Sequence, residues 1–158
     1  MSSLGRQKQL AFIEKFLGTW DTVERKPSYP GSDGYERKGV LTQTMGPGGQ
    51  SHLIKYVIGN PEVLAGFETL TFDPARNVFM GYAFNDQGPG AFVTEGNWEG
   101  DTLVFRGQVQ VNGQLIQIRK ILTDITPSSY AIRVYGTFPG GPEMLYLETL
   151  LSLKPLSQ

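Results

Sequence analysis

The sequence predicts an all-β fold, an up-and-down antiparallel barrel of about ten strands with one short N-terminal helix capping an end. Glycine (20 residues) and proline (10 residues) make up roughly a fifth of the 158 residues, against about 12% on average, which excludes a helical bundle. From Thr19 onward, turn signals separate about ten strand-like runs at the spacing of a sandwich or barrel. No crossover helix interrupts these hairpins, and closure into a barrel would remove the edges of the sheet.

The N-terminal helix is predicted from a periodic apolar face. Leu10, Ile13, Phe16 and Leu17 fall on one side of it, and Gly18 ends it. With 39% hydrophobic and 18% charged residues, the chain has enough apolar material for one core. We expect a single domain over residues 1–158, with the helix over about 6–17 and the barrel over about 18–155.

The hairpin at Asn112-Gly113 is the best-determined element, because this dipeptide accepts the positive φ angles of a type I′ turn and so sets the strand register. Counting outward from the turn gives one apolar face interrupted by Lys120. Its expected pairs are Val111 with Gln114, Val109 with Ile116, Gly107 with Ile118, Phe105 with Lys120 and Leu103 with Leu122. On the other face, Gln108 pairs with Gln117, Arg106 with Arg119 and Val104 with Ile121.

One polar cluster emerges if the last two strands lie beside this hairpin. Its members would share one face: Arg106, Arg119, Arg133, Tyr135, Tyr146 and Glu148. If that face lines the barrel interior, the cluster would hold a carboxylate or another anionic group through arginine and tyrosine contacts. Apolar faces of antiparallel sheets usually turn inward, however, and the cluster would then be a solvated outer surface on which Glu148 relieves the arginines. Apolar side chains left outside would then suggest a homodimer: Met144, Leu150, Val104 and Ile121.

The chain supplies few groups for catalysis or metal binding. It has no cysteine and one histidine, His52, which excludes disulfides, thiolate nucleophiles and two-histidine sites. We predict no catalytic residue, no metal and no cofactor. His52 is expected to be a hydrogen-bonded structural residue, with haem ligation or a general-base role as alternatives. Lys120 is expected to extend toward water at a barrel end, with a Schiff-base or anion-binding role as alternatives.

Charge and targeting signals indicate an ordinary cytoplasmic protein. The formal net charge of −1 favours neither nucleic acid nor a membrane surface as a partner. Charged residues interrupt the N-terminal stretch where a signal peptide would need an apolar run, and no other run has the length of a membrane span.

Several stretches carry a resemblance to a known group of proteins. Phe16-Leu17-Gly18-Thr19-Trp20 places Gly-x-Trp between the helix and the first strand, and this resembles the signature of calycin barrels: lipocalins, fatty-acid-binding proteins and nitrobindin-like proteins. The stretches Gly66 to Pro74, Val78 to Phe84 and Glu95 to Leu103, with a closing strand around Glu148, look like an uncharacterised bacterial calycin-like family. The resemblance covers nearly the whole chain.

This resemblance implies a ten-stranded barrel with Trp20 packed at its closed end, and no established activity. The closing strand reads Leu151-Ser152-Leu153-Lys154 where the family ends in Tyr-Thr-Arg, so a role of that arginine is not carried over. Arg133-Val134-Tyr135 is similar to the Arg-x-Tyr pair that holds a carboxylate in fatty-acid-binding proteins. Nitrobindin-like proteins bind haem through a histidine near the C-terminus, which is missing here, so haem is not expected by that route.

The leading hypothesis is a binding protein that holds a small apolar or anionic amphipathic molecule in the barrel lumen. The predicted ligand-binding residues are Trp20, Arg106, Arg119, Arg133, Tyr135, Tyr146 and Glu148. Two alternatives stand beside it. One is an acid/base enzyme of the lumen with Glu148 or His52 as the base, and the other is a ligand-free structural homodimer.

Overall fold

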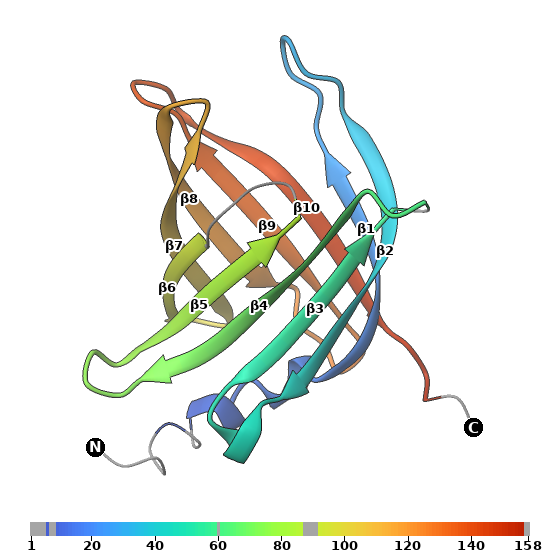
Figure 1. The fold of residues 1–158 in the computed structure, drawn as a ribbon, viewed down its shortest axis with the longest axis vertical. Coiled ribbons are helices and arrows are strands. Elements are labelled where there is room, and N and C mark those ends of the chain that lie inside the picture. Colours follow the sequence, from blue (N-terminus) through green and yellow to red (C-terminus); the bar gives the residue numbers. More distant parts are fainter. Residues whose placement is uncertain (1–5, 7–8, 60, 87–91, 157–158) are drawn as a thin grey trace.

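The computed structural model describes residues 6, 9–59, 61–86 and 92–156. In these residues ten antiparallel strands form a closed barrel, in which strands adjacent in sequence pair with each other and β1 closes the ring against β10 (Figure 1). The predicted all-β, up-and-down barrel is confirmed. The strands are β1 (Gly18–Lys26), β2 (Tyr35–Met45), β3 (His52–Ile58), β4 (Leu64–Asp73), β5 (Val78–Asn85), β6 (Phe92–Glu99), β7 (Thr102–Val111), β8 (Gln114–Thr123), β9 (Ser129–Thr137) and β10 (Glu143–Leu153).

The β7–β8 hairpin has the register that its turn predicts. Asn112 and Gly113 adopt φ angles of 49° and 78°, as a type I′ turn requires. Every pair counted outward from them is present, from Val111 with Gln114 to Leu103 with Leu122. The last two strands are also neighbours, but their register shifts between Leu145 and Leu147, an irregularity that alternation alone does not reveal.

The N-terminal segment is helical for a shorter stretch than predicted. Residue 6 and residues 9–11 are helical, the chain then turns, and a 3₁₀ helix, η1 (Glu14–Phe16), leads into β1. Backbone hydrogen bonds run from the Ile13 amide to Leu10 and from the Phe16 amide to Ile13. The i, i+3 spacing of the three apolar residues explains the difference, because side chains three apart stack on one side of a 3₁₀ turn.

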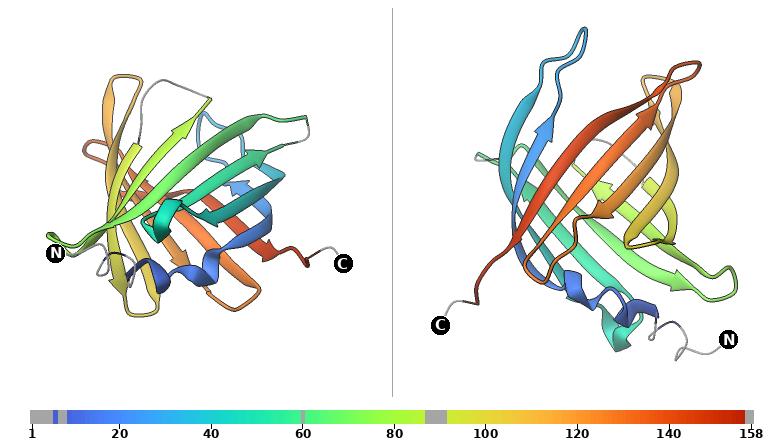
Figure 2. Two further views of the ribbon diagram at one scale, coloured as in Figure 1. Left: turned by 60° about the horizontal axis from the view of Figure 1, so that its bottom comes forward. Right: turned by 180° about the vertical axis from the view of Figure 1, so that it is seen from behind.

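These three side chains seal one end of the barrel. Leu10 and Ile13 are fully buried and Phe16 is nearly so. The Trp20 indole donates a 2.9 Å hydrogen bond to the Phe16 carbonyl oxygen, and the Tyr130 ring makes edge contacts with Phe16 and Trp20, at 4.8 Å between centroids in each case. Figure 2 shows the segment running along this end, where the β2–β3 turn η2 (Pro47–Gly49) also lies.

The glycine-rich stretch before β3, Gly46-Pro47-Gly48-Gly49, is therefore the tip of the β2–β3 hairpin. In the part of the chain that the structure describes, no helix has the length and apolar character needed to cross a membrane.

Candidate functional site

The inner wall of the barrel changes character along its axis. Near the N-terminal segment the inward side chains are tightly packed, and Trp20, Phe79 and Leu103 are at most 1% exposed. Farther along the strands, Ile118 and Val134 also face inward, yet both are only partly buried. Room for water therefore remains against the inner wall in this part of the barrel, and we call this part the lumen.

An ion pair links opposite parts of the lumen wall. Lys120 Nζ on β8 lies 2.8 and 2.9 Å from the two carboxylate oxygens of Glu68 on β4, with three strands between them around the ring. The two side chains are 19% and 14% exposed, and Nζ also lies 5.0 Å from the centroid of the Phe105 ring. The expectation that Lys120 extends out at a barrel end is wrong, because Glu68 holds its ammonium group inside.

Tyr56 on β3 adds a neutral hydroxyl to the lumen. Burial, followed by the charge of Glu68, raises the pKa of Tyr56 to about 12, while a hydrogen bond with the Asn85 side chain works in the opposite direction. The Tyr56 ring lies across Gly66, where an added Cβ atom would stand 2.5 Å from the phenol oxygen. The phenol therefore stays protonated at neutral pH and is available for hydrogen bonding.

A second charged group lies on β1 and β2. The Glu24 side chain is buried, at 5% exposure, and accepts a 2.9 Å hydrogen bond from the Tyr35 hydroxyl. Burial and then the charge of Glu24 raise the pKa of Tyr35 to about 12. Glu24 also contributes to the raised pKa of Tyr56, so its carboxylate acts on the same interior.

Arg37 is the unusual member of this group. It pairs directly with Glu24 across the β1–β2 ladder and so shares its inward face, and its guanidinium carbon lies 3.9 Å from the centroid of the Tyr35 ring. The eight ion pairs among the described residues do not include it, and no side-chain hydrogen bond within that part of the chain involves it. Within the described part of the chain, this part-buried cation therefore forms no ion pair, although the Glu24 carboxylate lies on the neighbouring strand.

The residues predicted as a ligand site lie elsewhere. Trp20 faces inward but belongs to the sealed end, at 1% exposure. The β7–β8 register turns Phe105 and Lys120 inward and thus Arg106 and Arg119 outward, and on β9 and β10 the same face carries Arg133, Tyr135 and Glu148. Tyr146 lies at the β10 irregularity and is 44% exposed.

The outward cluster is neutralised by carboxylates. Arg106 pairs with Glu99 at 2.6 Å, Arg119 with Glu143 at 2.5 Å, and Arg133 with both Glu148 at 2.8 Å and Asp124 at 3.1 Å. Pairing Arg119 with the first residue of β10 relieves the cross-strand repulsion from Arg106. A ligand in the lumen does not reach these residues, so the lumen placement of the cluster is corrected, and any ligand-binding role on the outer surface stays a prediction.

The apolar residues expected to remain outside do not form an exposed patch. Val104 is only 3% exposed, because it lies in the row between Thr102 and Arg106, where the Arg106–Glu99 ion pair crosses it. Ile121 and Leu150 are partly buried as well, so Met144, at 42% exposure, is the one exposed member of the four. The homodimer stays a prediction.

The two residues named as alternative bases are also out of reach of the lumen. Glu148 faces outward against Arg133, and His52 is fully buried at the sealed end. His52 Nδ1 lies 2.7 Å from the Gln43 amide nitrogen, and burial lowers the pKa of the ring. Its environment is that of a hydrogen-bonded structural residue. Among the described residues, no group of three or more histidine or acidic side chains could hold a metal.

Sequence reasoning missed Glu24, Arg37 and Glu68. The sequence did contain a signal for them, because each is a single charged residue in the row of alternate residues that faces the core, as Lys120 is in its own strand. Arg37 precedes Gly39 and Leu41 in such a row, and Glu68 precedes Leu70 and Phe72. A lone charge of this kind normally marks a residue at a barrel end. Here three such residues and Lys120 lie within the interior.

The fold resembles solved structures at very low sequence identity. Rv2717c from M. tuberculosis superposes with a TM-score of 0.60 at 12% identity, covering 92% of this chain and 97% of that one. The S-type phycobiliprotein lyase CPES from Guillardia theta superposes with a TM-score of 0.59 at 12% identity, covering 94% and 93%. No family model matches the sequence, and no curated protein matches it. These likenesses show a shared calycin-like barrel fold.

Proposed function

We propose that the lumen binds a small amphipathic molecule whose anionic group contacts Arg37 and whose apolar part lies against the inner wall. The observation that carries this proposal is the guanidinium of Arg37, which forms no ion pair with any described residue, lies 3.9 Å from the centroid of the Tyr35 ring and faces inward. A part-buried arginine without a counterion is costly unless water or a ligand anion satisfies its donors. A carboxylate or phosphate would meet it through two parallel hydrogen bonds.

The rest of the lumen suits the remainder of such a molecule. Ile118 and Val134 give an apolar surface, and Tyr56 offers a phenol that stays neutral. The Glu68 carboxylate is occupied by Lys120, so it does not repel an anion as a free carboxylate would. A few placed polar groups in an apolar wall are typical of small-molecule sites.

The comparisons support ligand binding as a use of this fold, since one similar barrel is a phycobiliprotein lyase. Membership of the uncharacterised bacterial calycin-like family is part of this proposal and rests on the Gly-x-Trp start and the stretches that follow it. The cytoplasmic location and the homodimer stay sequence predictions.

Two measurements test the proposal. Native mass spectrometry and organic extraction of freshly purified protein should show a bound small molecule or an empty lumen that a probe fills. The probe is 11-(dansylamino)undecanoic acid, an anionic amphiphile whose fluorescence rises in apolar surroundings. Its uncharged methyl ester reports the apolar contribution alone.

Arg37→Gln should weaken binding of the acid by about tenfold or more, the effect of losing a charge-assisted contact, and should leave the ester unchanged. Arg106→Gln is the matched control, because Arg106 faces outward, and it should change the affinity less than about twofold. Equal losses in both variants, or no probe binding with nothing extracted, would show that the lumen does not hold such a ligand.

A further inference from the structure

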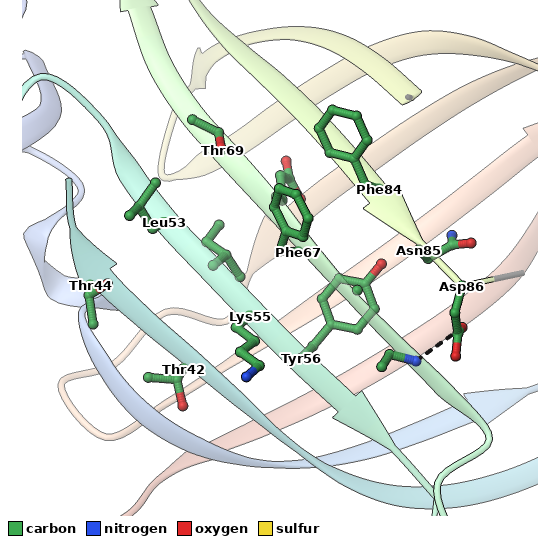
Figure 3. A pocket seen from close by; sticks show the side chains of 14 residues that line it. Thr42, Thr44, Leu53, Lys55, Tyr56, Phe67, Thr69, Phe84, Asn85 and Asp86 are labelled. Atoms are coloured by element: carbon green, nitrogen blue, oxygen red, sulfur yellow. Dashed lines mark hydrogen bonds between the residues drawn. The ribbon is translucent and has the colours of Figure 1, made fainter. Parts of the chain in front are cut away.

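The outer wall over β2 to β5 carries a hollow of about 930 Å³ (Figure 3). The side chains that line it come from four neighbouring strands and are mostly apolar or hydroxylic: Thr42, Leu53, Lys55, Phe67, Thr69 and Phe84. They alternate with Tyr56 and Glu68, which point into the lumen. Tyr56 and Glu68 are also among the residues that line the hollow, at the wall between it and the lumen.

An aromatic pair at its centre is exposed, and no other ring of the described residues stacks on it. Phe67 and Phe84 face each other across the β4–β5 ladder, with stacked rings 5.0 Å apart and 25° between planes. They are 51% and 38% exposed. Neighbouring Leu53 is 41% exposed, so apolar surface is continuous across three strands, as at a binding site.

A cation completes the same row. Lys55 pairs with Phe67 across the β3–β4 ladder, next to the aromatic pair. Its ammonium group has no ion pair or hydrogen bond with the part of the chain that the structure describes. Two acidic residues are among those that line the hollow. Glu68 is paired with Lys120 inside the barrel. Asp86 accepts a hydrogen bond from the Ala65 amide at 3.2 Å, and two strand spacings, about 10 Å, separate its strand from that of Lys55.

We propose that this hollow binds a flat aromatic anion, with its ring on Phe67 and Phe84 and its carboxylate, sulfonate or phosphate at Lys55. The volume lies within the range of small-molecule sites, roughly 300–1,000 Å³, whereas a protein partner would use a flatter surface. The row from Lys55 to Phe84 sets the order of charge and ring in the ligand. The outward side chains that would hold this ligand, Lys55, Phe67 and Phe84, are not those of the proposed lumen site, so the proposal does not rest on the function proposed above.

The experiment is an NMR titration of ¹⁵N-labelled protein with 1-naphthoate and with its uncharged analogue 1-naphthamide. Both should shift the amide signals of β3 to β5 around Lys55, Phe67 and Phe84 in a saturable manner, and naphthoate should bind more tightly. Lys55→Gln should weaken naphthoate by about two- to fivefold, as expected for one exposed ion pair, and leave naphthamide unchanged. Lys38→Gln is the matched control, since Lys38 is exposed on β2 but does not line the hollow.

Phe67→Ser should weaken both compounds by about tenfold, because aromatic contact serves the charged and the uncharged ligand alike. The spectrum of each variant without ligand shows whether it is folded. Saturable shifts confined to lumen residues such as Ile118 and Val134 would overturn the proposal. Equal effects of Lys55→Gln and Lys38→Gln on naphthoate binding, or the absence of saturable shifts, would also overturn it. Shifts that appear without ligand and grow with protein concentration would overturn it as well, because they would show that the hollow is a contact between two copies of the chain.

Discussion

Replacing Lys120 with methionine should lower the free energy of unfolding by about 2 kcal/mol. The substitution leaves the Glu68 carboxylate inside the barrel without its partner at 2.8 Å. Removing one member of a fully buried pair costs about 3–5 kcal/mol, and an exposed pair contributes about 0.2–1 kcal/mol. With side chains 19% and 14% exposed, this pair falls between these limits.

The assay is urea unfolding of the wild type, Lys120→Met, Glu68→Gln and the double variant at neutral pH. With a slope of about 2 kcal/mol per molar urea, Lys120→Met should lower the midpoint by about 1 M. The double variant should recover most of this loss, because replacing both members of a buried pair is often nearly neutral. If the two single losses simply add in the double variant, Lys120 and Glu68 are not coupled and the interior ion pair is refuted.

Three further predictions concern the barrel interior. Burial lowers the pKa of His52 in the folded protein, so the unfolded chain takes up a proton at a higher pH than the folded chain does. The contribution of neutral His52 to stability is therefore present above pH about 6.5 and is lost as the pH falls below that value. The urea midpoints at pH 7.5 and pH 5 should differ less in His52→Gln than in the wild type. Gly66→Ala should cost about 1–3 kcal/mol, since its Cβ atom would lie 2.4 Å from the Phe84 carbonyl oxygen. Gly136→Ala, with ordinary contacts from 3.6 Å, should be nearly neutral, and urea unfolding of both glycine variants checks the difference. Tyr56→Phe should remove one tyrosine step near pH 12 from the absorbance titration at 295 nm, whereas loss of amplitude near pH 10 would show that Tyr56 ionises as an ordinary exposed tyrosine.

The fold could be predicted because its determinants are local. The Asn112-Gly113 turn sets the pairing of two complete strands, and the glycine and proline turns leave no room for crossover helices. The N-terminal helix was predicted too long for an equally local reason. An i, i+3 apolar spacing fits both an α-helix and a 3₁₀ turn, and only the packing of Ile13 and Phe16 into the barrel end selects the latter.

The candidate site could not be predicted in the same way, because its partners meet across the barrel and not along a hairpin. Glu68 and Lys120 are 52 residues apart in the chain, and three strands lie between theirs around the ring, so neither turn chemistry nor strand alternation couples them. The outward arginines could be grouped from the sequence because strand alternation places them on one face of neighbouring strands, yet each has an acidic partner that neutralises its charge. Arg37 has none among the described residues, and a cation that the fold leaves uncompensated points to a ligand more strongly than a cluster that is already neutralised.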